Sequence, residues 1–260
     1  MNRTQTLACA LFSVGLAGLG ILAFVFGDFA LGWQPVPQGL PARRMVAYAC
    51  GLLMLLLAVG LLLRATVAWS ARILFVYLIL WTSLKIPAIF AAPQIEGVWL
   101  GLGELTILLA GGWMLYIRLS GLPSRFATGP GAATAARLLF AASLIPIGIS
   151  HFLYTPQTVA LIPTWLPFRH GLALSTGAAQ VLCGVLILLR PVPRPIPRIA
   201  AFGESVLITL FTFFVWISAI VAAPATRLPW TAFFISWILG AGAWAVALTF
   251  HAPIAREYPS

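Results

Sequence analysis

Three features of the sequence predict an all-α, polytopic membrane protein with eight transmembrane helices. Of the 260 residues, 62% are hydrophobic and only 8% are charged, whereas a soluble domain carries about 25% charged residues. The apolar residues gather in eight runs of about 20 residues, long enough to cross the hydrocarbon core of a bilayer. The third feature is an internal repeat, which divides the eight runs into two sets of four.

Each apolar run is expected to form a helix, because unpaired backbone amides are too costly inside lipid. The first run follows Arg3, is too long for the core of a signal peptide and is not followed by an A-x-A cleavage site. It is therefore interpreted as a retained helix. The predicted spans are 6–26, 45–63, 73–92, 98–117, 136–153, 171–189, 200–222 and 230–250.

The internal repeat is clearest around the second helix of each set. Residues Pro37–Arg64 align with Pro163–Arg190 without a gap, and 11 of the 28 pairs are identical. After five extra residues in the second copy, AIFAAP at 88–93 matches AIVAAP at 219–224. The register then continues through the aligned pairs Trp99/Trp230, Gly111/Gly242 and Trp113/Trp244.

The repeat also predicts the domain organisation. One four-helix bundle is expected over residues 1–120 and a second over 136–260, joined by a linker at 121–135 that is rich in Gly, Pro, Ser, Thr and Ala. Because four is an even number, both copies insert in the same orientation. A pseudo-twofold axis parallel to the membrane normal should therefore relate the two bundles.

The charge distribution predicts how the chain lies in the membrane. The net charge is +10, but the arginines stand between apolar runs, which indicates topology signals and not nucleic-acid binding. Ten arginines fall on the side of the N-terminus, the loops after the second, fourth and sixth helices and the C-terminal tail, against four on the other side. The positive-inside rule then places both termini in the cytoplasm.

The second copy resembles the DoxX-like family of bacterial four-helix membrane proteins. The stretch that carries the resemblance is GISHFLYTPQTVALIPTWLPFRHGLALSTG, with Gly148, His151, Phe152, Pro163, Trp165, Pro167 and Gly177 as the matching residues. In the first copy Val25 takes the place of the histidine and Gly39 that of the tryptophan. The resemblance implies a bacterial inner-membrane protein. The family is named after a subunit associated with thiosulfate:quinone oxidation, and most of its members have no assigned reaction.

Lys85 and Glu104 are the ionisable residues that stand out within the predicted spans. Both are expected about 10 Å below the same membrane face, on consecutive antiparallel helices. Two interpretations stay open: an ion pair that joins the two helices, or a polar wall of a site for a ligand or a proton. The aligned residues of the second copy are Trp216 and Ile235, so the pair is not duplicated.

Five further residues are candidates for ligand binding. His151 is expected at the outer end of the fifth helix, where it either contacts a quinone or lipid headgroup or is satisfied by backbone or water. Gln180 is expected near mid-membrane, with an interhelical hydrogen bond as the simpler explanation. Trp165 belongs to a predicted interfacial aromatic belt. Arg169 and His170 open the sixth helix and either contact lipid phosphate or cap a neighbouring helix.

Two acidic residues near the predicted helix ends are interpreted as structural. Asp28 is expected to pair with Arg43 or Arg44 beyond the outer end of the first helix. Glu204 is expected near the cytoplasmic end of the seventh helix, where it pairs with a nearby arginine or reaches water.

The sequence favours no metal site and no evident cofactor apart from a bound quinone or lipid. It contains no phosphate-binding loop, no H-E-x-x-H motif and no cysteine cluster, and its three histidines do not supply the two facing pairs of a two-haem site. The three cysteines lie singly within apolar runs, so no disulfide framework is expected.

Three functional hypotheses follow. The first is a binding or accessory protein that holds a quinone, an isoprenoid or a lipid, or that serves a redox or envelope partner in the membrane. The second is a proton-coupled transporter and the third a membrane enzyme acting on a lipid-soluble substrate, both of which would use Lys85, Glu104 and His151. The expected partners are membrane lipids, with a membrane protein or a second copy of the chain as further candidates.

Overall fold

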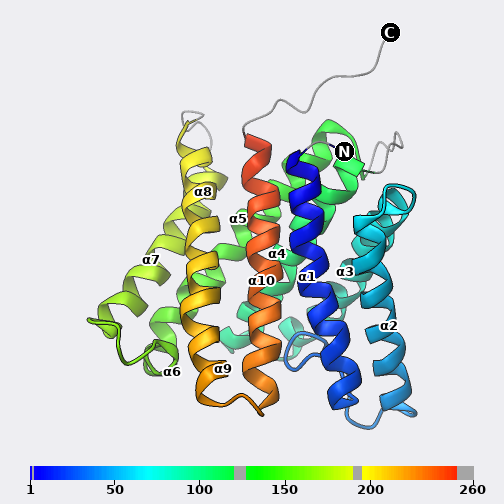
Figure 1. Ribbon diagram of the computed structural model, residues 1–260. Coiled ribbons are helices and arrows are strands. Elements are labelled where there is room, and N and C mark those ends of the chain that lie inside the picture. The colour runs from blue at the N-terminus through cyan, green and yellow to red at the C-terminus, as the bar shows by residue number, and fades with distance from the viewer. Residues whose placement is uncertain (2, 120–126, 190–194, 251–260) are drawn as a thin grey trace.

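The computed structural model describes Met1 and residues 3–119, 127–189 and 195–250 (Figure 1). This part of the chain is built from helices and turns and contains no β-strand. The helices in chain order are α1 (Arg3–Phe26), α2 (Arg43–Leu62), α3 (Val67–Ala91), α4 (Glu96–Leu119), α5 (Pro130–Leu153), α6 (Thr155–Leu161), α7 (Arg169–Leu188), α8 (Pro195–Phe211), the π-helical η1 (Thr212–Ile217), α9 (Ser218–Ala222), α10 (Arg227–Ala247) and the 3₁₀ turn η2 (Leu248–Phe250).

Eight helical segments of the described residues are long and apolar enough to span a membrane, which confirms the predicted multi-pass class. Three helices, α8, η1 and α9, form one of these spans, over residues 195–222. The largest differences in boundaries are at α3, which begins at Val67 and not near residue 73, and at α5, which begins at Pro130 and not near residue 136. Proline suits the first helical position of α5. Residues 121–126 of the predicted linker lie outside the described part.

The spans alternate in direction, so the molecule has two distinct faces. The terminal face carries the N-terminus and the turn at 63–66, and Figure 1 shows the start of α1 and the end of α10 on this side. The opposite face, here called the loop face, carries the longer connections at 27–42 and 154–168. Short helix α6 lies within the second of these connections and was not predicted from the sequence.

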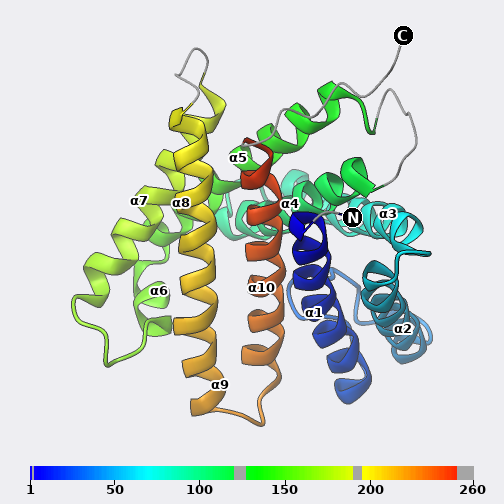
Figure 2. The ribbon, with the colours of Figure 1, turned by 45° about the horizontal axis from the view of Figure 1, so that its top comes forward.

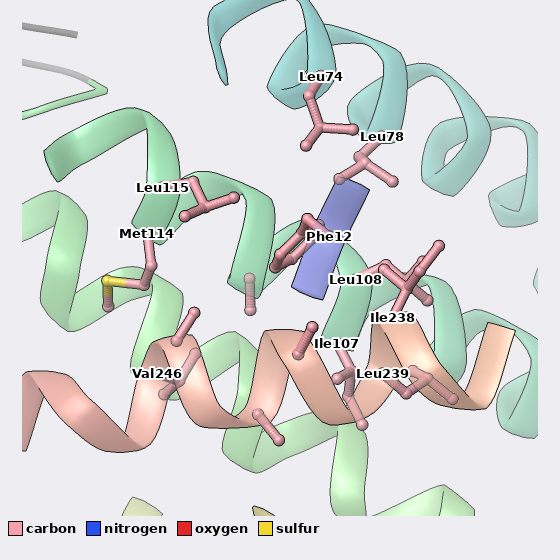
Figure 3. Close-up of a cluster of buried hydrophobic side chains, with 14 of the residues drawn as sticks. Phe12, Leu74, Leu78, Ile107, Leu108, Met114, Leu115, Ile238, Leu239 and Val246 are labelled. Carbon is pink, nitrogen blue, oxygen red and sulfur yellow. The ribbon is translucent and has the colours of Figure 1, made fainter. Parts of the chain in front are cut away.

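Helices α4 and α10 cross at the centre of the molecule. Gly111 and Gly242 meet at the crossing so closely that a Cβ atom on Gly111 would lie less than 3.0 Å from the Gly242 backbone. Around this crossing, buried aliphatic side chains of α4 and α10 enclose Phe12 of α1, which is fully buried (Figure 3). Small residues that let two backbones approach are typical of helix packing in membranes, where van der Waals contact drives association.

The remaining helices pack around this central pair in two corresponding sets. Helix α1 packs on α2 and α10, and α5 packs on α7 and α4. Helices α2 and α7 are the outermost helices at the two edges of the molecule in both ribbon views (Figure 2). The first helix of each half therefore packs on the last helix of the other half, with α1 on α10 and α5 on α4.

An ion-pair cluster joins the two halves at the loop face. Asp28 pairs with Arg43 at 2.7 Å and with Arg227 at 3.3 Å, and Arg227 also donates to the carbonyl of Phe29. The Asp28–Arg43 contact is one of the predicted alternatives and is confirmed. Burial alone would raise the pKa of Asp28, but hydrogen bonds from Phe29 N–H and Arg227, with the charges of both arginines, hold it below its usual value.

Several aligned residues of the two halves share the same local structure. Ala42 and Phe168, the residues before α2 and α7, both adopt left-handed backbone conformations, with φ of 52° and 53°. The indole of Trp99 donates to the carbonyl of Pro93 at 3.0 Å, and the indole of Trp230 donates to the carbonyl of Pro224 at 2.8 Å.

Glycine contacts of α2 and α7 also correspond. Gly177 faces His151 and the backbone of Gly148, whereas Gly51 faces Ala23 and the backbone of Gly20. Ala23, and not Val25, therefore stands where the second half has His151. The gap-free alignment holds for the second helix of each copy. It does not hold for the first helix, because the connection between the first and second helices differs in length between the two copies.

Candidate functional site

A cavity of about 520 Å³ lies toward the loop face, lined mostly by the second half of the chain and bounded on one side by Trp33 and α4 of the first half. Its volume falls within the range of about 300–1,000 Å³ that is typical of small-molecule sites. Apolar side chains of α4 to α8, η1 and α10 make most of its wall. The polar side chains of the wall include Glu104, Ser150, His151, Thr176, Gln180 and Ser236.

His151 is held in one orientation by the close packing of α5 on α7. Gly148 and His151 lie one turn apart on α5, and both face Gly177, where a Cβ atom would come within 2.6 Å of the His151 Cβ. The ring Nδ1 lies 3.0 Å from the carbonyl oxygen of Ala173 and 3.1 Å from the hydroxyl of Thr176. A carbonyl only accepts, so Nδ1 carries the proton, and Nε2 is left as a hydrogen-bond acceptor in the neutral ring.

Glu104 brings a carboxyl group to the cavity from α4, near the centre of the molecule. The indole of Trp33, which lines the same cavity from the 27–42 connection, approaches this carboxyl group without completing a hydrogen bond of standard geometry. Trp33 also lines a small hollow in the first half, so it forms part of the partition between the two halves.

Gln180 connects the cavity to a second buried carboxyl group. Its side chain lies beside Glu204 of α8, whose exposed fraction is 0%. Neither Glu204 oxygen has a hydrogen-bond partner among the described residues. The expectation that Glu204 reaches water is wrong. Because α8 begins at Pro195, Glu204 lies about 14 Å along the helix and not near its end.

The π-helical segment η1 shapes the wall of the cavity opposite α7. Trp216 of η1 donates its indole N–H to the hydroxyl of Ser236 on α10 at 2.8 Å, which fixes the indole at the cavity surface. Phe214 also lines the cavity, and it is 45% exposed. Single π-helical turns are frequent at functional sites.

The corresponding place in the first half is filled. A hollow of only about 30 Å³ remains there, lined by Met54, Tyr77 and Leu105 among others. The residues aligned with these three are Gln180, Ile208 and Ser236, all of which line the large cavity. Ile208 is smaller than the aligned Tyr77, and Ser236 is smaller than the aligned Leu105. The side chains of the second half therefore fill less volume at these positions.

Lys85 lies outside the cavity wall. Its ammonium group donates to the carbonyl of Gly32 at 2.6 Å and packs against Gly101 of α4. The ion pairs found among the described residues both involve Asp28, so the expected Lys85–Glu104 pair does not form. Through this hydrogen bond to Gly32, Lys85 instead links α3 to the 27–42 connection.

The other predicted binding residues, Trp165, Arg169 and His170, do not line the cavity. Trp165 is 62% exposed and its ring meets that of Phe214 edge to face, with ring centres 5.9 Å apart. Arg169 and His170 begin α7, where His170 is exposed. Of the seven predicted site residues, Glu104, His151 and Gln180 line the cavity.

Sequence reasoning missed three contributors to the site. Trp33 is not among the candidates that the sequence supplies, Trp216 stands out there only as the residue aligned with Lys85, and Glu204 is expected to pair with an arginine or reach water. The five extra residues in the second copy, which precede the AIVAAP match, were the available signal for the unusual helix geometry at η1.

The described residues contain no group of three or more His, Cys, Asp or Glu side chains that could hold a metal ion. The cavity therefore offers hydrogen-bonding and apolar groups, with one carboxyl and one imidazole, for contact with a ligand. No protein-family model, curated protein or solved structure matches the chain.

Proposed function

We propose that the protein is a membrane-embedded binding or accessory protein that holds a lipid-soluble molecule, such as a quinone, an isoprenoid or a lipid, in the cavity of its second half. The observation that carries this proposal is the 520 Å³ cavity, whose apolar wall brings together Glu104, His151 and Gln180 from three different helices. A site with few, convergent polar groups in an apolar wall is the usual form of a small-molecule site.

The polar groups of the cavity favour one kind of ligand head. No lysine or arginine is among its lining residues, so an anionic head would enter without a counter-ion. His151 Nε2 accepts hydrogen bonds, as does the carboxyl group of Glu104 when ionised. The preferred ligand is therefore uncharged and carries a hydroxyl or similar donor on an apolar body. Entry from the bilayer is expected beside Phe214, a cavity-lining side chain that is 45% exposed.

The broader assignment is part of the same proposal. We place the chain among DoxX-like proteins of the bacterial inner membrane, as two tandem four-helix units related by a parallel pseudo-twofold axis, with both termini in the cytoplasm. Support for the duplication comes from the matching conformations of Ala42 and Phe168, and from the meeting of aligned Gly111 and Gly242 at one crossing. The contrast between a filled and an open half suggests that one unit was specialised for binding.

A proton-coupled carrier is the second candidate, and Glu204 is the observation that favours it. This carboxyl group is fully buried, has no hydrogen-bond partner in the described part of the chain and lies beside Gln180 of the cavity. Buried ionisable residues within membrane spans commonly serve proton relays. Replacement of Glu204 by leucine should abolish pH-driven uptake in proteoliposomes if the protein is a carrier, and should leave ligand retention unchanged if it is a binding protein.

The direct test is native mass spectrometry, combined with lipid analysis, of the protein purified in mild detergent. The wild-type protein should retain one apolar ligand per chain. The double variant Gln180→Met with Ile208→Tyr, which copies the aligned residues of the filled half, should lose it. Val221→Tyr, at a 75% exposed position of the same span, is the control and should retain the ligand. Equal occupancy in all three proteins would refute the cavity as the binding site.

A further inference from the structure

A second hollow lies on the other side of α4, between α4 and α5. It is a groove of about 590 Å³ that starts at the loop face and ends near Thr106 and Ser143. Its lining residues on α4, including Leu102, Gly103 and Thr106, are different from those of the cavity, such as Glu104 and Ile107. The groove is thus separate from the proposed ligand site.

Side-chain size explains why the groove exists. In the other contact between the halves, α10 packs on α1 through Phe234 and Trp237, whose aligned residues on α4 are Gly103 and Thr106. Phe233, which is aligned with Leu102, packs on Phe234 and Trp237. The ring of Phe234 lies against Gly18 of α1, and the indole of Trp237 donates to the carbonyl of Leu11 at 2.8 Å. The α4–α5 contact lacks these three aromatic side chains, and an open channel takes their place.

A carboxyl group without a counter-ion stands at the loop-face end of the groove. Glu96 lines the groove, and both of its oxygens are shielded from water without a hydrogen-bond partner among the described residues. The residue aligned with Glu96 is Arg227, which has Asp28 as its partner. Among the described residues, no lysine or arginine lines the groove. The charge of Arg227 is therefore neutralised by Asp28 of the same chain, whereas Glu96 has no such partner among the described residues.

The rim around Glu96 is held in place. Tyr154, at the end of α5, accepts a hydrogen bond from the backbone N–H of Gly97 at 3.1 Å, which joins the start of α4 to α5. The indole of Trp99 donates to the carbonyl of Pro93. The groove thus combines a fixed interfacial end, a desolvated carboxylate and an apolar channel that runs into the membrane.

We infer that this groove binds an aminophospholipid of the surrounding bilayer, with an acyl chain in the channel and the headgroup ammonium on Glu96. A desolvated carboxylate needs a cation or a donor to offset its burial, and a primary ammonium supplies both. An anionic lipid would be repelled by Glu96. A choline headgroup has the charge but no N–H to donate, so ethanolamine lipids are preferred over choline lipids.

The test is lipid retention measured by native mass spectrometry on the full-length protein, after exchange into mixed micelles of phosphatidylethanolamine, phosphatidylcholine and phosphatidylglycerol in equal amounts. The wild-type protein should retain phosphatidylethanolamine at least about tenfold over phosphatidylglycerol, as expected for one charge-assisted hydrogen bond. Glu96→Gln should lose this preference while keeping the wild-type melting temperature, and Glu96→Asp should keep part of it.

A filling variant tests the channel independently of the charge. Thr106→Trp copies the aligned Trp237 and should displace the lipid, whereas Val76→Trp, at a 59% exposed position of α3, should not. Glu104→Gln, in the separate cavity, should leave retention of phosphatidylethanolamine unchanged, so failure of one site is distinguishable from failure of the other. Equal retention of the three lipids by the wild-type protein would overturn the inference, as would a lipid-free two-chain species that closes the groove.

Discussion

Replacement of Gly111 by alanine should destabilise the protein through the α4–α10 crossing. The new Cβ would lie less than 3.0 Å from the Gly242 backbone and 3.0 Å from the ring of Phe12. Carbon atoms in contact are normally about 3.5–4.0 Å apart, so the two central helices must separate. Overpacking of this kind costs about 1–3 kcal/mol, and alanine regains up to about 1 kcal/mol of helix propensity.

The net loss expected for Gly111→Ala is therefore about 0–2 kcal/mol once the full gain in helix propensity is subtracted. Gly203→Ala is the matched control, because a Cβ on Gly203 of α8 would meet no atom within 4 Å. That variant should be stabilised by up to about 1 kcal/mol from helix propensity alone. Equilibrium unfolding in mixed micelles with increasing dodecyl sulfate measures the free energy of unfolding of the two variants and of the wild-type protein. A Gly111→Ala variant as stable as Gly203→Ala would refute the close crossing of α4 and α10.

Two further predictions concern the site and the loop face. Gly177→Ala should push His151 from its place and reduce ligand retention several-fold, since its Cβ would lie 2.6 Å from the His151 Cβ. Gly171→Ala, with nothing within 4 Å, should retain the ligand, and equal retention by both would contradict the assigned packing. Asp28→Asn should lower the free energy of unfolding by about 1–2 kcal/mol at pH 7. Because the folded-state pKa of Asp28 is lowered, its contribution is lost as pH falls below its usual value of 3.8. Thermal melts of the two proteins should therefore converge at low pH, and a constant difference would assign the effect to another interaction.

The spans were predictable from the sequence because lipid imposes a minimum length and a helical backbone on every apolar run. The Asp28–Arg43 pair was predictable because the end of the first span and the start of the second must lie at the same membrane face. The Lys85–Glu104 pair was not, since depth in the membrane does not define the path of a connection. Gly32, with φ of 77°, folds that connection back and offers Lys85 a carbonyl instead.

The site was predictable in its polar residues and not in its shape. Glu104, His151 and Gln180 stood out because polar groups are rare in apolar runs. The cavity depends on volumes at positions that face one another only in the fold, such as Ile208 and Ser236, and nothing in an apolar run marks such positions. The misplacement of Glu204 followed from an error of five residues in the start of one helix.

The contact of α1 with α10 has a consequence for biosynthesis. Helix α1 is made long before α10, one of its packing partners, so this side of α1 must wait in the bilayer until α10 has been inserted. During that interval the glycine-lined side of α1, which later receives Phe234, faces lipid or a chaperone. Chains that stop before α10 should therefore insert but remain incompletely assembled, which offers membrane proteases a simple way to recognise them.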